Sequence, residues 1–192
     1  MSEINRGKVL EFKVPGKRGE ENIPRQENKG LGYYIDYAQK AYAAGDYKTA
    51  ISALYACLEL TDEDFDIKLM LGDCYFELND FDEGSKIYEE LLKEQPRNFE
   101  VVYRLGREYL LEGLDEAAVE KFRVALDIDP HSQEAMFYLG ETLAGLGNHA
   151  EAIGYLNKIT SASLKTKAQG ILKDLIESSD LKIIRKANEE LS

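Results

Sequence analysis

Apolar residues in the middle of the chain recur at the spacing of amphipathic helices. In residues 99–130 they form two stripes, separated by a break at Glu112-Gly113. The first stripe has i, i+3, i+4, i+7 spacing, and the two stripes consist of Val102, Leu105, Gly106 and Tyr109, and of Ala118, Phe122 and Ala125. Such spacing places apolar side chains on one face of a helix. Glycine tolerates the left-handed conformation that commonly ends a helix, and proline, here Pro130, cannot continue a helix interior. The segment therefore predicts a helical hairpin.

This hairpin pattern recurs at one fixed interval along the chain. The repeated positions are the pairs Leu71-Gly72, Leu105-Gly106 and Leu139-Gly140, the prolines Pro96 and Pro130, and the turn residues Gly45, Asn79, Gly113 and Gly147. A fixed period of this length indicates stacked supersecondary units rather than one globular core. Small residues such as Gly106 and Ala118 let paired helices approach closely, and Tyr109 and Phe122 fill the space beside them.

The repeated positions resemble the tetratricopeptide repeat, a helix–turn–helix unit whose period matches the interval from Leu71 to Leu105. In four successive units the matching residues are Tyr34, Ala38, Ala41, Gly45, Asp46, Tyr47, Ala50, Leu54 and Cys57; Leu71, Gly72, Tyr75, Gly84, Tyr88 and Pro96; Leu105, Gly106, Tyr109, Ala118, Phe122, Ala125 and Pro130; and Leu139, Gly140, Leu143, Gly147, Ala152 and Leu156. The units span residues 31–64, 65–98, 99–132 and 133–166. The resemblance implies an all-α fold, a right-handed superhelical α-solenoid whose surfaces serve partners.

The C-terminal residues 167–192 predict a pair of capping helices, equivalent to a degenerate fifth repeat. Two amphipathic stretches, split by Ser178-Ser179-Asp180, carry Ile171, Leu172, Leu175 and Ile176, and Leu181, Ile184, Ala187 and Leu191. Ser179 or Asp180 is a suitable N-cap for the second helix. A polar cap of this kind keeps the end of a repeat array soluble.

The N-terminal residues 1–30 show no helical period and form a separate region. They contain glycine and proline breaks, seven Lys/Arg and five Asp/Glu, and a short apolar cluster of Val9, Leu10, Phe12 and Val14. We interpret the region as an extended or disordered tail. Three roles stay open for it: packing on the first repeat, binding a partner as a linear motif, or folding back into the protein's own groove.

Charge and composition narrow the class of partner. The net charge of the 192-residue chain is −12, so residues 31–192 carry −14 once the basic N-terminal region is set aside. A surface this acidic repels phosphate backbones, which argues against nucleic acid as a partner. No apolar stretch approaches the roughly 20 residues that cross a bilayer, and no signal segment precedes the repeats. We therefore expect a cytoplasmic protein without membrane insertion, and the charge leaves its oligomeric state open.

Residues able to carry chemistry are sparse. Cys57 and Cys74 fall where packing residues are expected, and His131 and His149 lie beside turns. Metal-ligand spacing, phosphate-binding glycine loops and nucleophile motifs do not occur in the sequence. We expect no catalytic residue, no metal and no cofactor, and therefore not an enzyme.

The resemblance also implies a concave groove lined by the first helix of each unit. Residues rotated by about 100° from the core stripe of that helix should face this groove. Stepping by one repeat at a time gives three ladders: Ile35, Leu69, Tyr103 and Phe137; Gln39, Asp73, Arg107 and Glu141; and Tyr42, Phe76, Leu110 and Ala144. Together with Arg104, they predict an apolar and aromatic groove with charged steps. Exposed apolar surface of this kind usually marks an interaction site.

The charged steps indicate the kind of partner. Some members of the family grip C-terminal carboxylates with a Lys/Asn/Arg set, and here only Arg104 fits that set. An amphipathic helix or extended peptide, with one acidic group at Arg104 or Arg107, fits better. The alternative that Arg107 pairs internally with Asp73 or Glu141 stays open. The leading hypothesis is a non-enzymatic adaptor or scaffold for a protein or peptide; the alternatives are a dedicated chaperone for a secreted or assembling partner and an enzyme accessory subunit.

Overall fold

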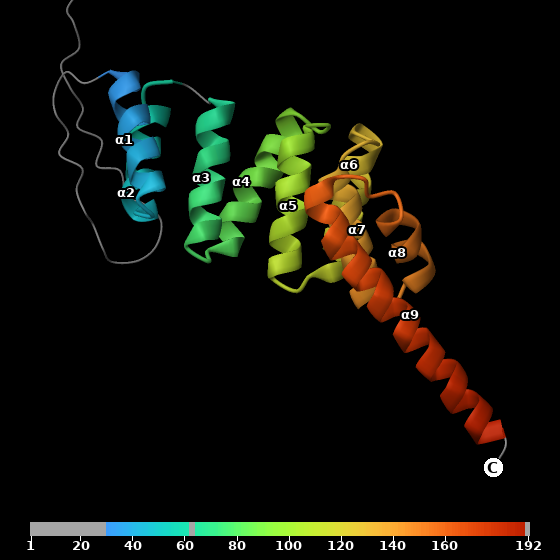
Figure 1. Ribbon diagram of the computed structural model, residues 1–192. Coiled ribbons are helices and arrows are strands. Elements are labelled where there is room, and N and C mark those ends of the chain that lie inside the picture. Colours follow the sequence, from blue (N-terminus) through green and yellow to red (C-terminus); the bar gives the residue numbers. More distant parts are fainter. Residues whose placement is uncertain (1–29, 62–63, 191–192) are drawn as a thin grey trace, which may run out of the picture.

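The computed structural model describes residues 30–61 and 64–190, with side chains described as far as Ser178. Within these ranges all regular structure is helical (Figure 1). The helices are α1 (Leu31–Ala43), α2 (Tyr47–Leu58), α3 (Phe65–Glu77), α4 (Phe81–Glu94), α5 (Phe99–Leu111), α6 (Asp115–Ile128), α7 (Gln133–Gly145), α8 (His149–Leu156) and α9 (Ala162–Glu190). The pairs α1–α2, α3–α4, α5–α6 and α7–α8 are antiparallel hairpins that stand side by side (Figure 1). The predicted all-α solenoid is confirmed.

The glycine of each Leu-Gly pair lies against a large buried side chain of the second helix. A Cβ added to Gly106 would lie 2.9 Å from Phe122, and one added to Gly72 would lie 2.5 Å from Tyr88. At Gly140 the neighbour is Leu156, at 2.8 Å. Carbon atoms do not approach so closely, so these three hairpins depend on glycine at this position. The small–large pairing that the sequence predicted is the packing rule of the fold.

The turns of the four hairpins share one backbone geometry. The residues Gly45, Asn79, Gly113 and Gly147 all have positive φ, between 58° and 79°. The residue after each of them donates a backbone hydrogen bond to a carbonyl five residues earlier, as Asn148 does to Leu143 at 2.8 Å. This 6→1 bond is the mark of a Schellman motif, which satisfies carbonyls at a helix end. The predicted left-handed helix ends are therefore present in every hairpin.

Two glycines in the last of these turns should respond oppositely to alanine. Gly147→Ala is expected to lower the free energy of unfolding by about 1 kcal/mol, because φ is +79° and L-residues resist that region. Gly145→Ala is expected to raise it by up to about 1 kcal/mol, since Gly145 ends α7 in open space. Urea denaturation of both variants measures the difference. Equal effects would contradict the Schellman geometry.

The predicted pair of capping helices is wrong in one respect, because residues 162–190 form the single helix α9. Serine and aspartate are mediocre helix formers, but neither blocks a helix as proline does. The Ser178 hydroxyl donates to the Leu175 carbonyl at 3.0 Å, so it is satisfied inside the helix. The first half of α9 packs on α7 and α8, and the remainder extends past the array (Figure 1).

Cys57 and Cys74 are fully buried packing residues, and burial raises the pKa of their thiols to about 11 and about 12. The predicted tail at residues 1–30 lies outside the described residues except for Gly30, which precedes α1. Among the described helices, none combines the length and the apolar composition that crossing a bilayer requires.

Candidate partner-binding site

The candidate site is the face made by α1, α3, α5 and α7, called here the first-helix face. Its helices are linked to one another by side chains. Asp73 of α3 pairs with Arg104 of α5, and Tyr103 of α5 contacts Tyr138 of α7 with ring centroids 6.1 Å apart. The face therefore forms one continuous surface along the second, third and fourth hairpins.

The two apolar ladders are more deeply packed than the sequence predicted. Phe137 is only 3% exposed, so its assignment to an open groove is wrong. The reason is α9, which packs on α7 and contributes Leu164, Ala168, Ile171, Leu172 and Leu175 to the core that contains Phe137. The other members of these ladders are half-buried in the clusters that join neighbouring hairpins: Ile35, Tyr42, Leu69, Phe76, Tyr103, Leu110 and Ala144.

The charged ladder is the part that reaches the surface. Gln39, Arg107 and Glu141 are exposed, and Asp73 is half-buried. Partial desolvation raises the pKa of the Glu141 carboxyl, and nearby Lys167 of α9 opposes that shift. Charge rather than apolar area therefore distinguishes this face.

A polar network ties the second hairpin to the third. Arg104 donates hydrogen bonds to the carboxylates of Asp73 and Glu100, and the Tyr88 hydroxyl of α4 also donates to Asp73. Burial disfavours the charge on Arg104, but its hydrogen bonds to Asp73 and Glu100 outweigh burial and raise the pKa. Burial raises the pKa of Tyr88, and the negative Asp73 adds to this shift. The network fixes the relative position of α3, α4 and α5.

Because of this network, Arg104, one of the two arginines predicted to bind a partner, is not available to do so. With Asp73 and Glu100 as its acceptors, Arg104 is already neutralised. Arg107 has a different neighbour from the two that the sequence left open, Asp73 and Glu141. The guanidinium of Arg107 lies over the ring of Tyr138, 5.5 Å from its centroid. A cation over an aromatic face is stabilised by the ring quadrupole.

The aromatic part of the face centres on α5 and α7. Phe99 and Tyr103 are stacked one turn apart, with centroids at 5.7 Å and planes 7° apart. Tyr138 stacks on the buried Phe122 at 5.8 Å, which holds its ring in place beneath Arg107. Aromatic and arginine side chains are both enriched in protein interfaces.

Negative charge accumulates between α3 and α5. Desolvation raises the pKa of Glu108, Arg107 lowers it, and the nearby Asp73, Glu77 and Glu112 raise it further. Burial raises the pKa of Tyr42 to about 12, and the charges of Asp73 and Glu77 add to that shift. Asp73 and Glu77 lie one turn apart on α3, and Glu108 lies one turn after Arg104, the ion-pair partner of Asp73, on α5. These three carboxylates are called here the α3–α5 acidic centre.

Sequence reasoning missed Glu108 and Tyr138 as members of the face. A signal for Glu108 was present: its equivalents one period away, Cys74 and Thr142, are buried residues. A carboxylate at a position that is otherwise buried is costly, and such exceptions often mark functional positions. A signal for Tyr138 was present as well, because it lies one repeat after Arg104, which the sequence analysis had assigned to the groove.

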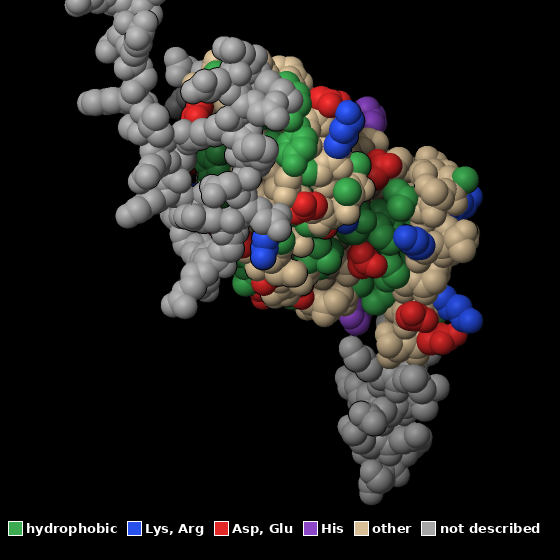
Figure 2. All heavy atoms as spheres, turned by 90° about the vertical axis from the view of Figure 1, so that its left-hand side faces the viewer, with side chains coloured by type: hydrophobic (Ala, Val, Ile, Leu, Met, Phe, Trp, Pro, Cys, Tyr) green, Lys and Arg blue, Asp and Glu red, His purple; other side chains and the backbone are tan. Residues whose placement is uncertain are grey.

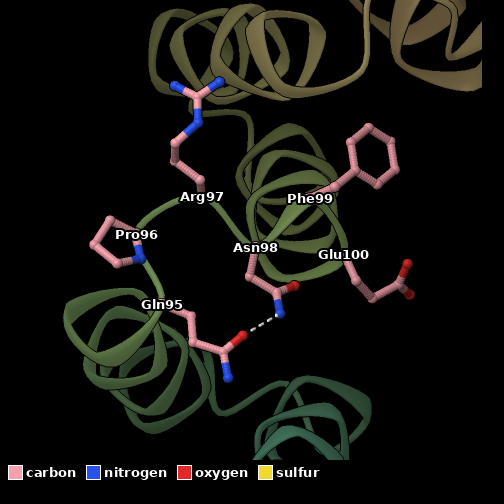
Figure 3. Close-up of a pocket in the computed structure, with 6 residues that line it drawn as sticks. All are labelled: Gln95, Pro96, Arg97, Asn98, Phe99 and Glu100. Carbon is pink, nitrogen blue, oxygen red and sulfur yellow. Dashed lines mark hydrogen bonds between the residues drawn. The ribbon is translucent and has the colours of Figure 1, made fainter.

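An open hollow of about 830 Å³ lies beside the α4–α5 connection, lined by residues 95–100 (Figure 3). Its polar groups are used within the protein. The Asn98 amide donates to the Gln95 side-chain oxygen at 3.0 Å, and the Arg97 guanidinium donates to the carbonyl of Asp127 at 3.0 Å. The hollow is therefore a feature of the turn that joins two repeats. In the described ranges no group of three or more His, Cys, Asp or Glu residues has a metal-binding arrangement.

The surface seen from the α1–α2 end mixes apolar patches with single charged side chains (Figure 2). Such mixed surfaces are typical of interfaces between proteins that also exist apart.

Comparison with known proteins agrees with the repeat architecture. A family model described as tetratricopeptide repeat matches residues 41–109 and 109–175. A solved structure of MamA (MSR-1) has a TM-score of 0.63 and 25% identity, covering 83% of this chain and 95% of that one. A tetratricopeptide repeat protein from Parabacteroides merdae, at 20% identity, shares the fold with a TM-score of 0.69, covering 78% of this chain and 61% of its own.

Two curated proteins show similarity over part of their length. The BBSome complex member BBS4 of Bos taurus is 27% identical over 132 residues, which is 68% of this chain and 25% of that protein. The peroxisomal targeting signal receptor of Saccharomyces cerevisiae is 28% identical over 102 residues, covering 53% of this chain and 17% of the receptor. The chain thus spans a quarter or less of the curated relatives it matches.

Proposed function

Because the chain belongs to the tetratricopeptide repeat family, we propose that it is a non-enzymatic adaptor that binds a protein segment on its first-helix face. Tetratricopeptide repeats are scaffolds for interactions between proteins, which supports the coarse function. The names of the curated relatives, a complex member and a receptor for a targeting signal, point in the same direction. In this proposal the adaptor acts in the cytoplasm without a cofactor, and its acidic surface disfavours nucleic acid.

The observation that carries the proposal is the arrangement of Arg107 and the rings beneath it. Arg107 is exposed, and its guanidinium lies over Tyr138, which is itself held by Phe122. The neighbouring Arg104 is committed to Asp73 and Glu100. A partner segment would therefore meet one available guanidinium, beside half-exposed aromatic surface, at the centre of the array. Central arginine and tyrosine residues carry much of the binding energy in many interfaces.

Arg107→Glu is expected to weaken partner binding by at least tenfold. The substitution replaces the central cation by a negative charge, which repels the acidic group that we expect the partner to place there. The free energy of unfolding should change by no more than about 1 kcal/mol, since exposed cation–π pairs contribute about that much. The measurement is capture of a partner from the native host by the full chain. Calorimetric titration of the captured partner against wild type and variant follows.

The matched control is Arg123→Glu, which makes the same charge change on the second helix of the same hairpin. Arg123 is exposed and pairs with Glu151 at 2.8 Å, so its loss should also cost little stability. It should leave partner affinity within about twofold of wild type. Equal losses from both variants would show that net charge, not this face, determines binding. Co-expression then separates an adaptor, whose partner is soluble alone, from a dedicated chaperone, whose partner is not.

A further inference from the structure

The α3–α5 acidic centre is not balanced by the arginines beside it. Arg104 is shared between Asp73 and Glu100, and Arg107 sits over Tyr138. Among the described residues, Glu77 and Glu108 form no ion pair with a basic side chain. Glu77 lies one turn after Asp73 on α3, and Glu108 lies one turn after Arg104 on α5, so both flank the Asp73–Arg104 pair that joins the two helices. The whole stretch 31–161 carries 26 Asp/Glu against 11 Lys/Arg. This part of the first-helix face therefore favours a positively charged occupant.

The chain itself contains a segment with the complementary charge. Residues 8–18 read KVLEFKVPGKR and hold four basic residues against the single Glu11. The same eleven residues include the apolar Val9, Leu10, Phe12 and Val14. Basic and apolar side chains are interspersed in this stretch, so one segment offers both positive charges for the carboxylates and apolar side chains for the rings of the face. Tyr103 of α5 and Tyr138 of α7, half-buried and in ring contact on the same first-helix face, offer the apolar contact.

The connection is long enough for this contact within one molecule. Residues 19–29 separate the segment from Gly30, which precedes α1. Eleven residues span up to about 35–40 Å when extended. Two steps between neighbouring helices separate α1 from the acidic centre. Packed helices lie about 8–10 Å apart, so the distance from α1 to the acidic centre is about 20 Å. A tethered segment also has a high effective concentration, so modest contacts are sufficient.

We propose that residues 8–18 of this chain occupy the α3–α5 part of the first-helix face, with their lysine and arginine side chains at Asp73, Glu77 and Glu108. The inference rests on the proposed function, because it takes the same face to be a binding site. An external partner of the adaptor then competes with this segment. The occupant is the chain's own segment rather than a second copy or a separate basic peptide.

A nitroxide label tests the contact in the full chain. The native thiols of Cys57 and Cys74 are fully buried, so a cysteine introduced by Glu20→Cys is labelled selectively. In isotopically labelled protein, the amide signals of Glu77 and Glu108 should broaden. Those of the exposed Glu116 and Glu120 on α6 should not. Broadening confined to other sites, or none at all, overturns the proposal.

Charge reversal identifies the residues responsible. Lys13→Glu with Lys17→Glu should return the signals of Glu77 and Glu108 to the level of the reduced, diamagnetic label. The matched control is Arg6→Glu with Arg25→Glu, which changes the net charge equally outside residues 8–18 and should retain the broadening. Equal loss in both variants would mean unspecific attraction and would overturn the assignment to residues 8–18.

A mixing experiment separates contact within one molecule from contact between two. Nitroxide-bearing chains without isotope are mixed with isotopic chains that lack the nitroxide. Unbroadened signals support the proposal, and broadening in this mixture assigns the contact to a second copy and overturns it. The proposed function is judged separately by the Arg107→Glu titration. If that variant loses its partner while the label shows no contact, the inference fails and the adaptor function stands.

Discussion

Phe137→Ala is expected to lower the free energy of unfolding by about 3–5 kcal/mol, the usual cost of removing a large aromatic side chain from a core. Phe137 is 3% exposed, and its ring meets that of Tyr138 edge to face with centroids 5.5 Å apart. It belongs to the cluster that joins α7 to α9, so the alanine variant leaves a cavity at the junction of the last hairpin with the terminal helix. Chemical denaturation followed by circular dichroism measures the loss.

Leu111→Ala is a suitable control, because this leucine at the end of α5 is 71% exposed. Its replacement should change the free energy of unfolding by no more than about 0.5 kcal/mol. If Phe137→Ala costs less than about 1 kcal/mol, α9 does not cover this side chain. The open groove that the sequence predicted at Phe137 would then be correct.

Gly106→Leu is expected to lower the free energy of unfolding by about 1–3 kcal/mol or more, because it overpacks the contact between α5 and α6. The first added carbon alone would lie 2.9 Å from Cε1 of Phe122 and 3.2 Å from Cβ of Lys121. Phe122 is fully buried and stacked on Tyr138, so its ring has little room to move. The helices must separate to admit the new side chain.

The control for this substitution is Gly154→Leu on α8. Nothing lies within 4 Å of a Cβ added at Gly154, and leucine is a better helix former than glycine. That variant should be neutral or slightly stabilising in the same denaturation experiment. A stability loss at Gly154 as large as that at Gly106 would show that the effect comes from the exposed leucine and not from the helix contact.

Most of the fold was predictable because its determinants are local and repeated. The repeat interval identified the glycines that touch Tyr88, Phe122 and Leu156, and it identified the turn residues with positive φ. Each of these features depends on residues within one hairpin. Local periodicity is the strongest signal that a single sequence carries.

The features that escaped prediction depend on contacts between elements. Phe137 occupies the same position in its unit as the half-buried Tyr103, but it is buried in a core to which α9 contributes side chains. The continuity of α9 through Ser178 results from the balance of weak propensities along a long helix. Neither outcome can be read from periodicity, which does not specify what covers a helix face.

The candidate site was predictable in its helices but not in its chemistry. Stepping by one repeat assigned Gln39, Arg107 and Glu141 to the first-helix face, and all three side chains are exposed. It did not distinguish Arg104, which is neutralised by Asp73 and Glu100, from Arg107, which lies over Tyr138. The two arginines are three positions apart on one helix, and their different roles follow from their neighbours: Asp73 of α3 and Glu100 of α5 for one, and Tyr138 of α7 for the other.

The length of α9 has a geometric consequence for whatever is attached beyond it. Leu175 is the last buried side chain among those described, and the helix continues to Glu190. At 1.5 Å per residue, these fifteen residues form a rod of about 22 Å that leaves the array (Figure 1). A protein domain fused to the end of α9 would be held at a fixed distance and in a fixed direction from the array. Helix phase would then fix its orientation, and each added residue would rotate it by about 100°.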